Sequence, residues 1–467
     1  MRYFIVLIVL ALYIFLFKKA AGTLKPNIMN VITFVFYSIL GFELIGGSLV
    51  YLGFDNHYLI QKITLDTTVD KTYYILAYTS LMLPVIMILS NKYIFNIDKT
   101  KNNEQEKLET SYINKLKEKV NLEDSKKRNR LYICLLVLII ICLISIIYVF
   151  THIGYIPILQ YFNSDINLAE ERINISRNFD GNQYIKNLIM LLITPIVSYI
   201  VYIYMRATKD KKWKVLFGIS FLLSIFAITY NFEKSSILYY LLFFFVIEIM
   251  LGNTFKLKSF IPILCVCAVI ILILYKFVFG YEGPIFSLSS GPIGRVLITQ
   301  VSTLFLHVDA FPEHIPYLNG HSFPEIMTGF MGDGAYDVRS GRAVMEMYSK
   351  STVENGTAGV MNTIFAGEAY ANFGIAGIII APVFVGLIFS AILAWFLKSR
   401  KTPLNMIIYL ESFIIFKDVL QGGFVDFFYN IKFLVMIIMM VGLIHIIKCD
   451  KIWSKIKIPK ALYKGEI

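Results

Sequence analysis

Stretches of about twenty apolar residues recur along the whole chain and constrain its fold more than any other feature. They lie near residues 2–17, 28–53, 72–95, 131–150, 184–205, 215–231, 235–251, 259–280, 371–397, 403–419 and 431–447. A bilayer core needs about twenty apolar residues per helix and leaves no backbone group unpaired. The sequence therefore predicts an all-α integral membrane protein with about eleven transmembrane helices and one large extracytoplasmic loop. A hydrophobic content of 57% and a mean hydropathy of +0.66 agree with this class.

The basic residues predict the orientation of the helices. Lysine and arginine gather in alternate connections and at the C-terminal end, which marks one side as cytoplasmic. This pattern accounts for most of the formal charge of +12 and argues against nucleic acid as a partner. The first predicted region, 1–280, holds transmembrane helices 1 to 8 and includes a cytoplasmic segment 96–130 and an outer loop 151–183. The second, 281–370, is a large extracytoplasmic loop with short helices. Residues 371–447 form helices 9 to 11, and 448–467 form a basic cytoplasmic tail.

The sequence gives little indication of a metal site, a disulfide bond or a nucleotide-binding site. The five cysteines lie in predicted spans or in the tail, without histidine or acidic residues at ligand spacing, so we interpret them as apolar filler. No glycine-rich phosphate loop is present. The cytoplasmic segment mixes lysine and glutamate at helical spacing, which predicts a solvated helix. We therefore expect no cofactor.

Arginine is concentrated in the predicted outward loops. The chain has only ten arginines among its 44 basic residues, yet five of them are predicted to face outward: Arg172, Arg177, Arg295, Arg339 and Arg342. A guanidinium binds phosphate or carboxylate through two parallel hydrogen bonds, whereas lysine offers a point charge. These arginines are candidates for binding an anionic substrate. The alternative is that they anchor the loops to lipid headgroups or pair with nearby acids.

The start of the large loop combines an arginine with an apolar helix. Arg295 precedes the segment 296–306, which we expect to form a helix that lies in or dips into the membrane. Gln300 and His307 are seven residues apart and share one face of this helix, and Asp309 follows its end. This face is a candidate polar cleft. The alternative for His307 is a purely structural role.

The end of the large loop places a carboxylate at the membrane boundary. Glu368 lies just before the ninth predicted span, where partial desolvation would raise its pKa and suit a general base. The alternative is that Glu368 pairs with an arginine and holds the loop. Arg339 and Arg342, with Glu346 one turn later, are further binding candidates, but their spacing also fits a local salt-bridged helix.

Three motifs resemble bacterial oligosaccharide repeat-unit polymerases, the O-antigen or capsule polymerase family. The first is Gly-Tyr-Ile-Pro-Ile-Leu at 154–159, which opens the outer loop with Arg172 and Arg177. The second is Gly-Arg at 294–295 followed by Gly-His-Ser-Phe at 320–323, and the third is Gly-Glu-Ala-Tyr-Ala-Asn-Phe-Gly-Ile-Ala-Gly at 367–377. The similarity of layout covers nearly the whole chain.

The resemblance implies a membrane glycosyltransferase of the GT-C type in the bacterial cytoplasmic membrane, with its active site facing outward. It implies transfer of a glycan from undecaprenyl diphosphate to a sugar hydroxyl of an incoming lipid-linked unit, without metal or nucleotide. Implied partners are these lipid-linked oligosaccharides, membrane lipids and possible accessory proteins, a chain-length regulator and a flippase. The candidates for stabilising the leaving group are Arg172, Arg177 and Arg295. The candidate base is Glu368, followed by Asp309 or His307. Further candidates for substrate binding are Gln300, Arg339, Arg342 and Asn372.

Other functions stay open at this point. An O-antigen-ligase-type enzyme would share the layout and the donor but use a different acceptor. A polysaccharide or lipid transporter, including a flippase, would show polar residues inside the helices. A sensor or scaffold would need no base. For an enzyme, we expect Arg295 and Glu368 to face one cleft at the outer surface, with the arginines of the 151–183 loop across from them.

Overall fold

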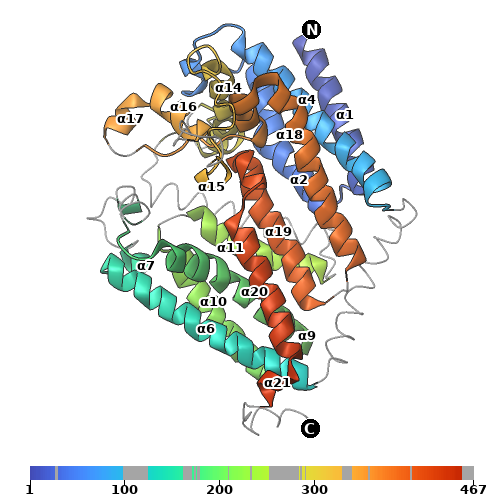
Figure 1. Ribbon diagram of the computed structural model, residues 1–467. Coiled ribbons are helices and arrows are strands. Elements are labelled where there is room, and N and C mark those ends of the chain that lie inside the picture. Colours follow the sequence, from blue (N-terminus) through green and yellow to red (C-terminus); the bar gives the residue numbers. More distant parts are fainter. Residues whose placement is uncertain are drawn as a thin grey trace. The chain divides into compact units, whose positions relative to one another are not determined.

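The protein is an all-helical membrane protein, as the sequence predicts. The computed structural model describes residues 1–26, 30–97, 125–160, 171–172, 175, 179–208, 210–231, 234–251, 283, 287–289, 291–328, 339–355, 358–399 and 402–454. These residues form helices and no strand (Figure 1). Seven helices are long and apolar enough to cross a membrane. The total of eleven spans stays a prediction, and the predicted span 259–280 and Arg177 lie outside the described residues.

The helices group into two compact units, each made of several separate stretches of the chain. Unit 1 comprises Met1–Asn103, Leu257–Lys398 and Phe413–Asn430. Unit 2 comprises Glu104–Lys256, Ser399–Ser412 and Ile431–Ile467. The large loop, the first spans and the turn after residue 420 therefore belong to one unit. All described candidate site residues except Arg172 lie in unit 1.

The described residues of unit 1 include four helices of membrane-spanning length. They are α1 (Arg2–Ala21); the continuous α2 (Val31–Ile39), η1 (Leu40–Leu44) and α3 (Ile45–Tyr51); α4 (Thr68–Leu89) with η3 (Ser90–Ile94); and α18 (Phe365–Lys398). Asn30 caps α2 by accepting a hydrogen bond from the Thr33 amide at 2.9 Å. Shorter elements between them are η2 (Ile60–Lys62), α13 (Pro292–Gly294), η6 (Arg295–Thr299), α14 (Gln300–Ala310), α15 (Glu325–Thr328), α16 (Ser340–Tyr348), α17 (Lys350–Glu354) and η7 (Val425–Phe427).

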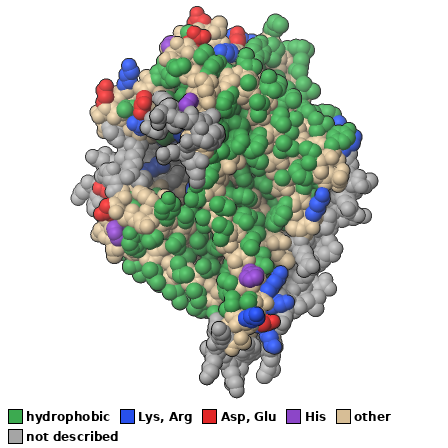
Figure 2. All heavy atoms as spheres, viewed as in Figure 1, with side chains coloured by type: hydrophobic (Ala, Val, Ile, Leu, Met, Phe, Trp, Pro, Cys, Tyr) green, Lys and Arg blue, Asp and Glu red, His purple; other side chains and the backbone are tan. Residues whose placement is uncertain are grey.

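Unit 2 contains the remaining described helices. They are α6 (Ser125–Ile153), α7 (Pro157–Gln160), η4 (Ile185–Ile193), α9 (Thr194–Thr208), α10 (Lys211–Ile228), α11 (Lys234–Met250), α20 (Ile431–Lys448) and α21 (Asp450–Trp453), while α19 (Pro403–Gly422) has residues in both units. Arg206 of α9 binds both carboxylate oxygens of Glu248 on α11, at 2.7 and 2.9 Å. This pair joins the two helices through charge-assisted hydrogen bonds. Hydrophobic side chains cover most of the described surface visible in Figure 2, as expected for helices in lipid.

A break in α18 separates its first turns from the membrane helix. Gly374 has φ 58° and ψ −138°, which is not helical. A Cβ at this position would lie 2.9 Å from the Tyr317 ring, and one at Gly377 would lie 2.1 Å from the carbonyl oxygen of Ala369. The sequence places residues up to 370 in a loop, but the structure starts the helix at Phe365. Glu368 therefore lies on a short buried helix ahead of the break.

Replacing Gly374 by alanine should destabilise unit 1. A positive φ with this ψ is sparsely populated by L-residues and costs of order 1–3 kcal/mol, and the new methyl group would meet Tyr317. We expect the thermal midpoint of the purified protein, followed by circular dichroism in detergent, to fall by several degrees. Gly442→Ala in α20 is the matched control, because a Cβ there meets nothing within 4 Å. Equal midpoints for the two variants would contradict this role of Gly374.

Candidate functional site

The predicted helix at the start of the large loop is present and buried. η6 and α14 form one continuous helix from Arg295 to Ala310, and every side chain from 301 to 310 is buried. Gln300 is half-buried at the start of α14, and Thr303 and His307 follow on the same face. The carboxylate of Asp309 lies near the end of this helix. The sequence therefore predicted the helix correctly, and the packing of unit 1 decides what its polar face contacts.

His307 presents one ring nitrogen without a partner. Its side chain is fully buried, and Nδ1 lies 2.7 Å from the carbonyl oxygen of Thr303. A carbonyl oxygen can only accept, so Nδ1 carries the proton and Nε2 of the neutral ring keeps a lone pair. Nε2 makes no hydrogen bond within the described part of the chain. Burial lowers the pKa of His307 to about 4, against the opposing effect of the Thr303 hydrogen bond, so the ring is neutral at physiological pH.

His307 lines a small pocket with room for roughly one water molecule. The lining residues are His307, Arg339, Ser340, Gly341, Val360, Asn362, Thr363, Glu368 and Gly422. The hydroxyl oxygen of Thr363 is buried and also makes no hydrogen bond with a described residue. Two buried polar groups at one pocket, an acceptor and a hydroxyl, thus lack a hydrogen-bond partner among the described residues. They suit a ligand that carries a hydroxyl group.

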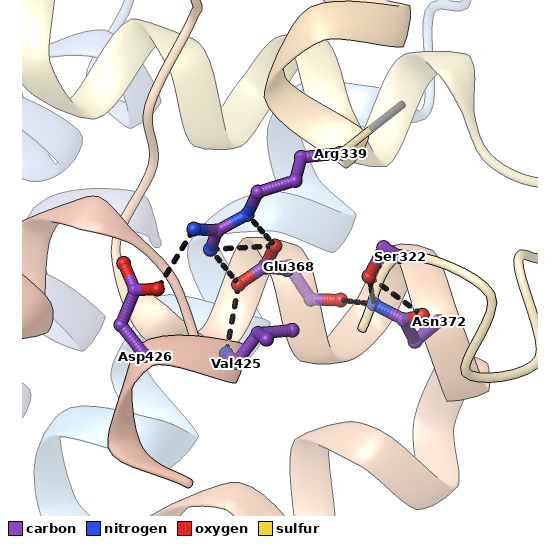
Figure 3. A network of polar contacts seen from close by, with 6 residues as sticks. All are labelled: Ser322, Arg339, Glu368, Asn372, Val425 and Asp426. Carbon is purple, nitrogen blue, oxygen red and sulfur yellow. Dashed lines mark hydrogen bonds and ion pairs between the residues drawn. The ribbon is translucent and has the colours of Figure 1, made fainter. Parts of the chain in front are cut away.

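Arg339 joins two carboxylates beside this pocket (Figure 3). Its Nε and Nη2 donate to Oε1 of Glu368 at 3.0 and 2.9 Å, and Nη2 also lies 2.8 Å from Oε2. Its Nη1 donates to Asp426 at 2.9 Å. Two carboxylates against one guanidinium leave a net charge of −1. The cluster therefore does not attract an anionic ligand by its charge.

The backbone around Glu368 is adapted to this ion pair. The amide of Val425 donates to Oε2 of Glu368 at 2.9 Å. Gly423 has φ 143°, and a Cβ there would lie 2.2 Å from the same carboxylate oxygen and 2.6 Å from Nη2 of Arg339. Glycine at 423 thus lets the chain pass directly over the ion pair. The start of α18, the residue that caps α16, and η7 meet at this point.

The geometry of Glu368 favours the alternative interpretation made from the sequence. Its side chain is 2% exposed, and both oxygens accept hydrogen bonds from Arg339, with a further bond from Val425. A carboxylate held in this way joins segments far apart in the chain. His307, with its unpartnered nitrogen, is better placed than Glu368 to accept a proton at the pocket.

Asn372 has a joining role one turn further along α18. Its amide donates to the Glu368 carbonyl oxygen at 2.9 Å and to the Ser322 hydroxyl at 2.7 Å. Its side-chain oxygen accepts from the Gly320 amide and from Ser322 (Figure 3). The buried amide is fully used, so Asn372 attaches the 320–322 turn to α18. This explains two of the sequence motifs as one structural contact.

Asp309 is held by five hydrogen bonds, three of them from the end of the 54–67 loop. Its oxygens accept from the amides of Thr64 and Leu65 and from the hydroxyls of Thr64, Thr68 and Tyr348, at 2.6 to 3.0 Å. Burial acts to raise the pKa of Asp309, but these hydrogen bonds outweigh it, so the pKa lies below its usual value. A carboxylate with this many donors suits an anchor between α14, α4 and α16.

The arginines occupy different surroundings. Arg342 pairs with Glu346 at 2.8 Å, which confirms the predicted local salt bridge, but Arg339 does not join it and turns to Glu368 instead. Arg295 is exposed and does not line the pocket. It precedes His307 by twelve residues of continuous helix, roughly 18 Å. The structure thus does not bring Arg295 and Glu368 into one pocket.

Several site residues escape prediction from the sequence. The predicted candidate Arg172 is exposed and belongs to unit 2, whereas the pocket lies in unit 1. The sequence does not distinguish Thr363 and Asp426 as site residues, because a lone threonine and an acid in a short turn carry no pattern of their own. One feature of the sequence does indicate Asp426 as a site residue, namely its position in a predicted outward turn. No group of three or more potential metal-binding side chains occurs among the described residues.

Comparison with known proteins identifies no relative. No protein-family model, no curated protein and no solved structure matches this chain.

Replacing Arg339 by alanine should destabilise the protein far more than replacing Arg342. Loss of Arg339 leaves the Glu368 carboxylate buried and unpaired, which costs about 3 kcal/mol or more. Loss of Arg342 removes a partly exposed pair, which costs less than about 1 kcal/mol. The measurement is the thermal midpoint of each variant in the same detergent. Adding Glu368→Gln to Arg339→Ala should restore part of the loss; similar midpoints for both single variants would contradict the assignment.

Proposed function

We propose that this protein polymerises lipid-linked oligosaccharide repeat units into a surface polysaccharide at the outer face of the bacterial cytoplasmic membrane. The substrate class comes from the resemblance of the sequence motifs to repeat-unit polymerases. The observation that carries the proposal is the pocket with the unpartnered His307 Nε2 and Thr363 hydroxyl. A sugar hydroxyl is the kind of group that these two atoms can bind and activate.

In this proposal the acceptor hydroxyl donates a hydrogen bond to Nε2 of His307. Its oxygen attacks the anomeric carbon of the donor, a new glycosidic bond forms, and the bond to the diphosphate oxygen breaks with its electron pair on the leaving group. The hydroxyl proton passes to Nε2. The hydrogen bond from Nδ1 to Thr303 orients the ring, and the nearby cluster with net charge −1 stabilises the imidazolium that forms.

The diphosphate of the incoming lipid-linked unit, at the far end of the repeat from the reacting hydroxyl, would bind away from this cluster. Arg339 already binds two carboxylates, and Arg342 binds Glu346. Arg295 is exposed on the same helix as His307 and is the arginine of unit 1 best suited to reach an anionic group. Gln300, one turn later, would assist it. Arg172 and Arg177 of the 151–183 loop are further candidates for this role.

The decisive experiment gives purified protein in vesicles a synthetic undecaprenyl diphosphate repeat unit. Polymerisation produces a ladder of products that differ by one repeat. Transfer of single glycans to an added acceptor without a ladder would indicate the ligase-type enzyme. Movement of intact substrate across the vesicle membrane without new glycosidic bonds would indicate a transporter. Either of these results overturns the proposal.

Replacing His307 by glutamine should lower turnover by roughly 10²–10⁴-fold, the usual contribution of a general base. Insertion and thermal stability should change much less, because glutamine is uncharged like the neutral ring. His445→Gln on an exposed position of α20 is the control and should keep full activity. A wild-type ladder from the His307 variant would remove this residue from the mechanism.

The pH dependence follows from the same residue. The neutral imidazole is the active form, so kcat/KM should be constant above about pH 5.5. It should fall as the pH drops through the pKa of His307, which burial lowers to about 4. Initial rates of ladder formation across this range test the expectation, after checking that the protein stays folded. An acid limb centred near pH 6.5 would show that an ordinary exposed group is the base.

A further inference from the structure

Glu43 is a buried carboxyl group inside a membrane helix. It lies in η1, a π-helical segment in the middle of the span Val31–Tyr51. Its side chain is 1% exposed, and neither carboxyl oxygen makes a hydrogen bond with any described residue. Single π-helical turns within membrane helices often mark functional positions, and so do ionisable residues at membrane depth.

The register of α3 against α4 indicates which residue of α4 lies at the level of this carboxyl. The rings of Tyr51 and Tyr73 stack with centroids 4.0 Å apart. One turn further into the membrane, a Cβ at Gly47 would lie 2.3 Å from Leu76. The next turn of this antiparallel pair places the carboxyl level with Ser80. The Ser80 hydroxyl is also buried and makes no hydrogen bond among the described residues.

No charged group among the described residues pairs with the carboxyl. The elements packed against η1 are α2, α3, α4, η6 and α14. Their titratable or charged side chains are Tyr37 in α2; Tyr51 in α3; Asp70, Lys71, Tyr73, Tyr74 and Tyr78 in α4; Arg295 in η6; and His307 and Asp309 in α14. None of these is hydrogen-bonded or ion-paired to Glu43 within the described part of the chain. An ionised carboxylate in such surroundings is strongly unfavourable, whereas a neutral carboxylic acid is tolerated.

We propose that Glu43 is a proton-binding site within unit 1, occupied by a proton at neutral pH. Ser80, at its level, would accept a hydrogen bond from the bound proton. A divalent cation such as Ca²⁺ or Mg²⁺ would need about six oxygen ligands, far more than one carboxyl and one hydroxyl supply. The site is independent of the proposed polymerase activity, because it rests on the burial of Glu43 alone.

The position of Glu43 connects its proton to the helix that carries His307. At Gly46, one turn along from Glu43, a Cβ would lie 1.8 Å from the carbonyl oxygen of Leu297, so α3 and η6 are in direct backbone contact. A negative charge at Glu43 would draw water into this contact and loosen it. The proton therefore keeps η6 and α14 packed against the membrane helices.

Dicyclohexylcarbodiimide tests the protonation directly, because it reacts with neutral carboxylic acids in apolar surroundings. The acid proton passes to a carbodiimide nitrogen and the carboxyl oxygen adds to the central carbon; acyl migration then leaves the whole reagent attached. Wild-type protein in vesicles is treated between pH 6 and 9 in potassium or sodium chloride, and peptides are analysed by mass spectrometry. We expect modification of Glu43 at neutral pH, less at high pH and none at exposed Glu313. Protection by sodium would replace the proton site with a cation site.

A second measurement decides the case in which the reagent does not reach Glu43. The thermal midpoint of the wild type should fall as the pH rises towards 9, because deprotonation places an unpaired charge in the core. Glu43→Gln mimics the protonated acid and should lose this decline, while Glu313→Gln should keep it. An unmodified Glu43 together with the same alkaline decline in wild type and Glu43→Gln would overturn the proposal. If Glu43→Gln does not fold, labelling of the wild type decides alone.

Discussion

The ion pair between Arg339 and Glu368 is the interaction on which the arrangement of unit 1 depends. A buried carboxylate is stable only with a partner, and here the partner caps α16, a segment far away in the sequence. The pair also hydrogen-bonds to Val425 and Asp426, so the start of α18, the start of α16 and η7 meet at one point. The pocket beside His307 exists because these three elements are held together.

Function in this protein is indicated by polar groups whose hydrogen bonds are left unmade. Most buried polar atoms at the site are satisfied: Asp309 accepts five hydrogen bonds and Asn372 uses its whole amide. His307 and Glu43 differ, because each keeps a buried atom without a described partner. Such atoms are costly in a folded protein, so they point to a ligand or a proton that completes them.

Residue type alone did not separate the catalytic from the structural candidates. The sequence favours Glu368 as the base, with Asp309 or His307 behind it, and all three are titratable residues of the large loop. Their roles differ because of their partners: Glu368 meets Arg339, Asp309 meets three side-chain hydroxyls and two amides, and Nε2 of His307 meets none. These partners come from positions 29 to 245 residues away for the two acids, a separation that local pattern reading does not bridge.

The sequence by itself determined that the chain is an all-helical membrane protein, because apolar segments of bilayer length allow no other structure. It also located the helix at 296–306 and the salt bridge of Arg342, since both depend on residues within one or two turns. The packing of the helices was needed to show that Glu368 lies in the first turn of a helix, that Arg339 binds it, and that Arg295 lies away from the pocket. These features depend on which helices pack together, and packing is a property of the whole chain.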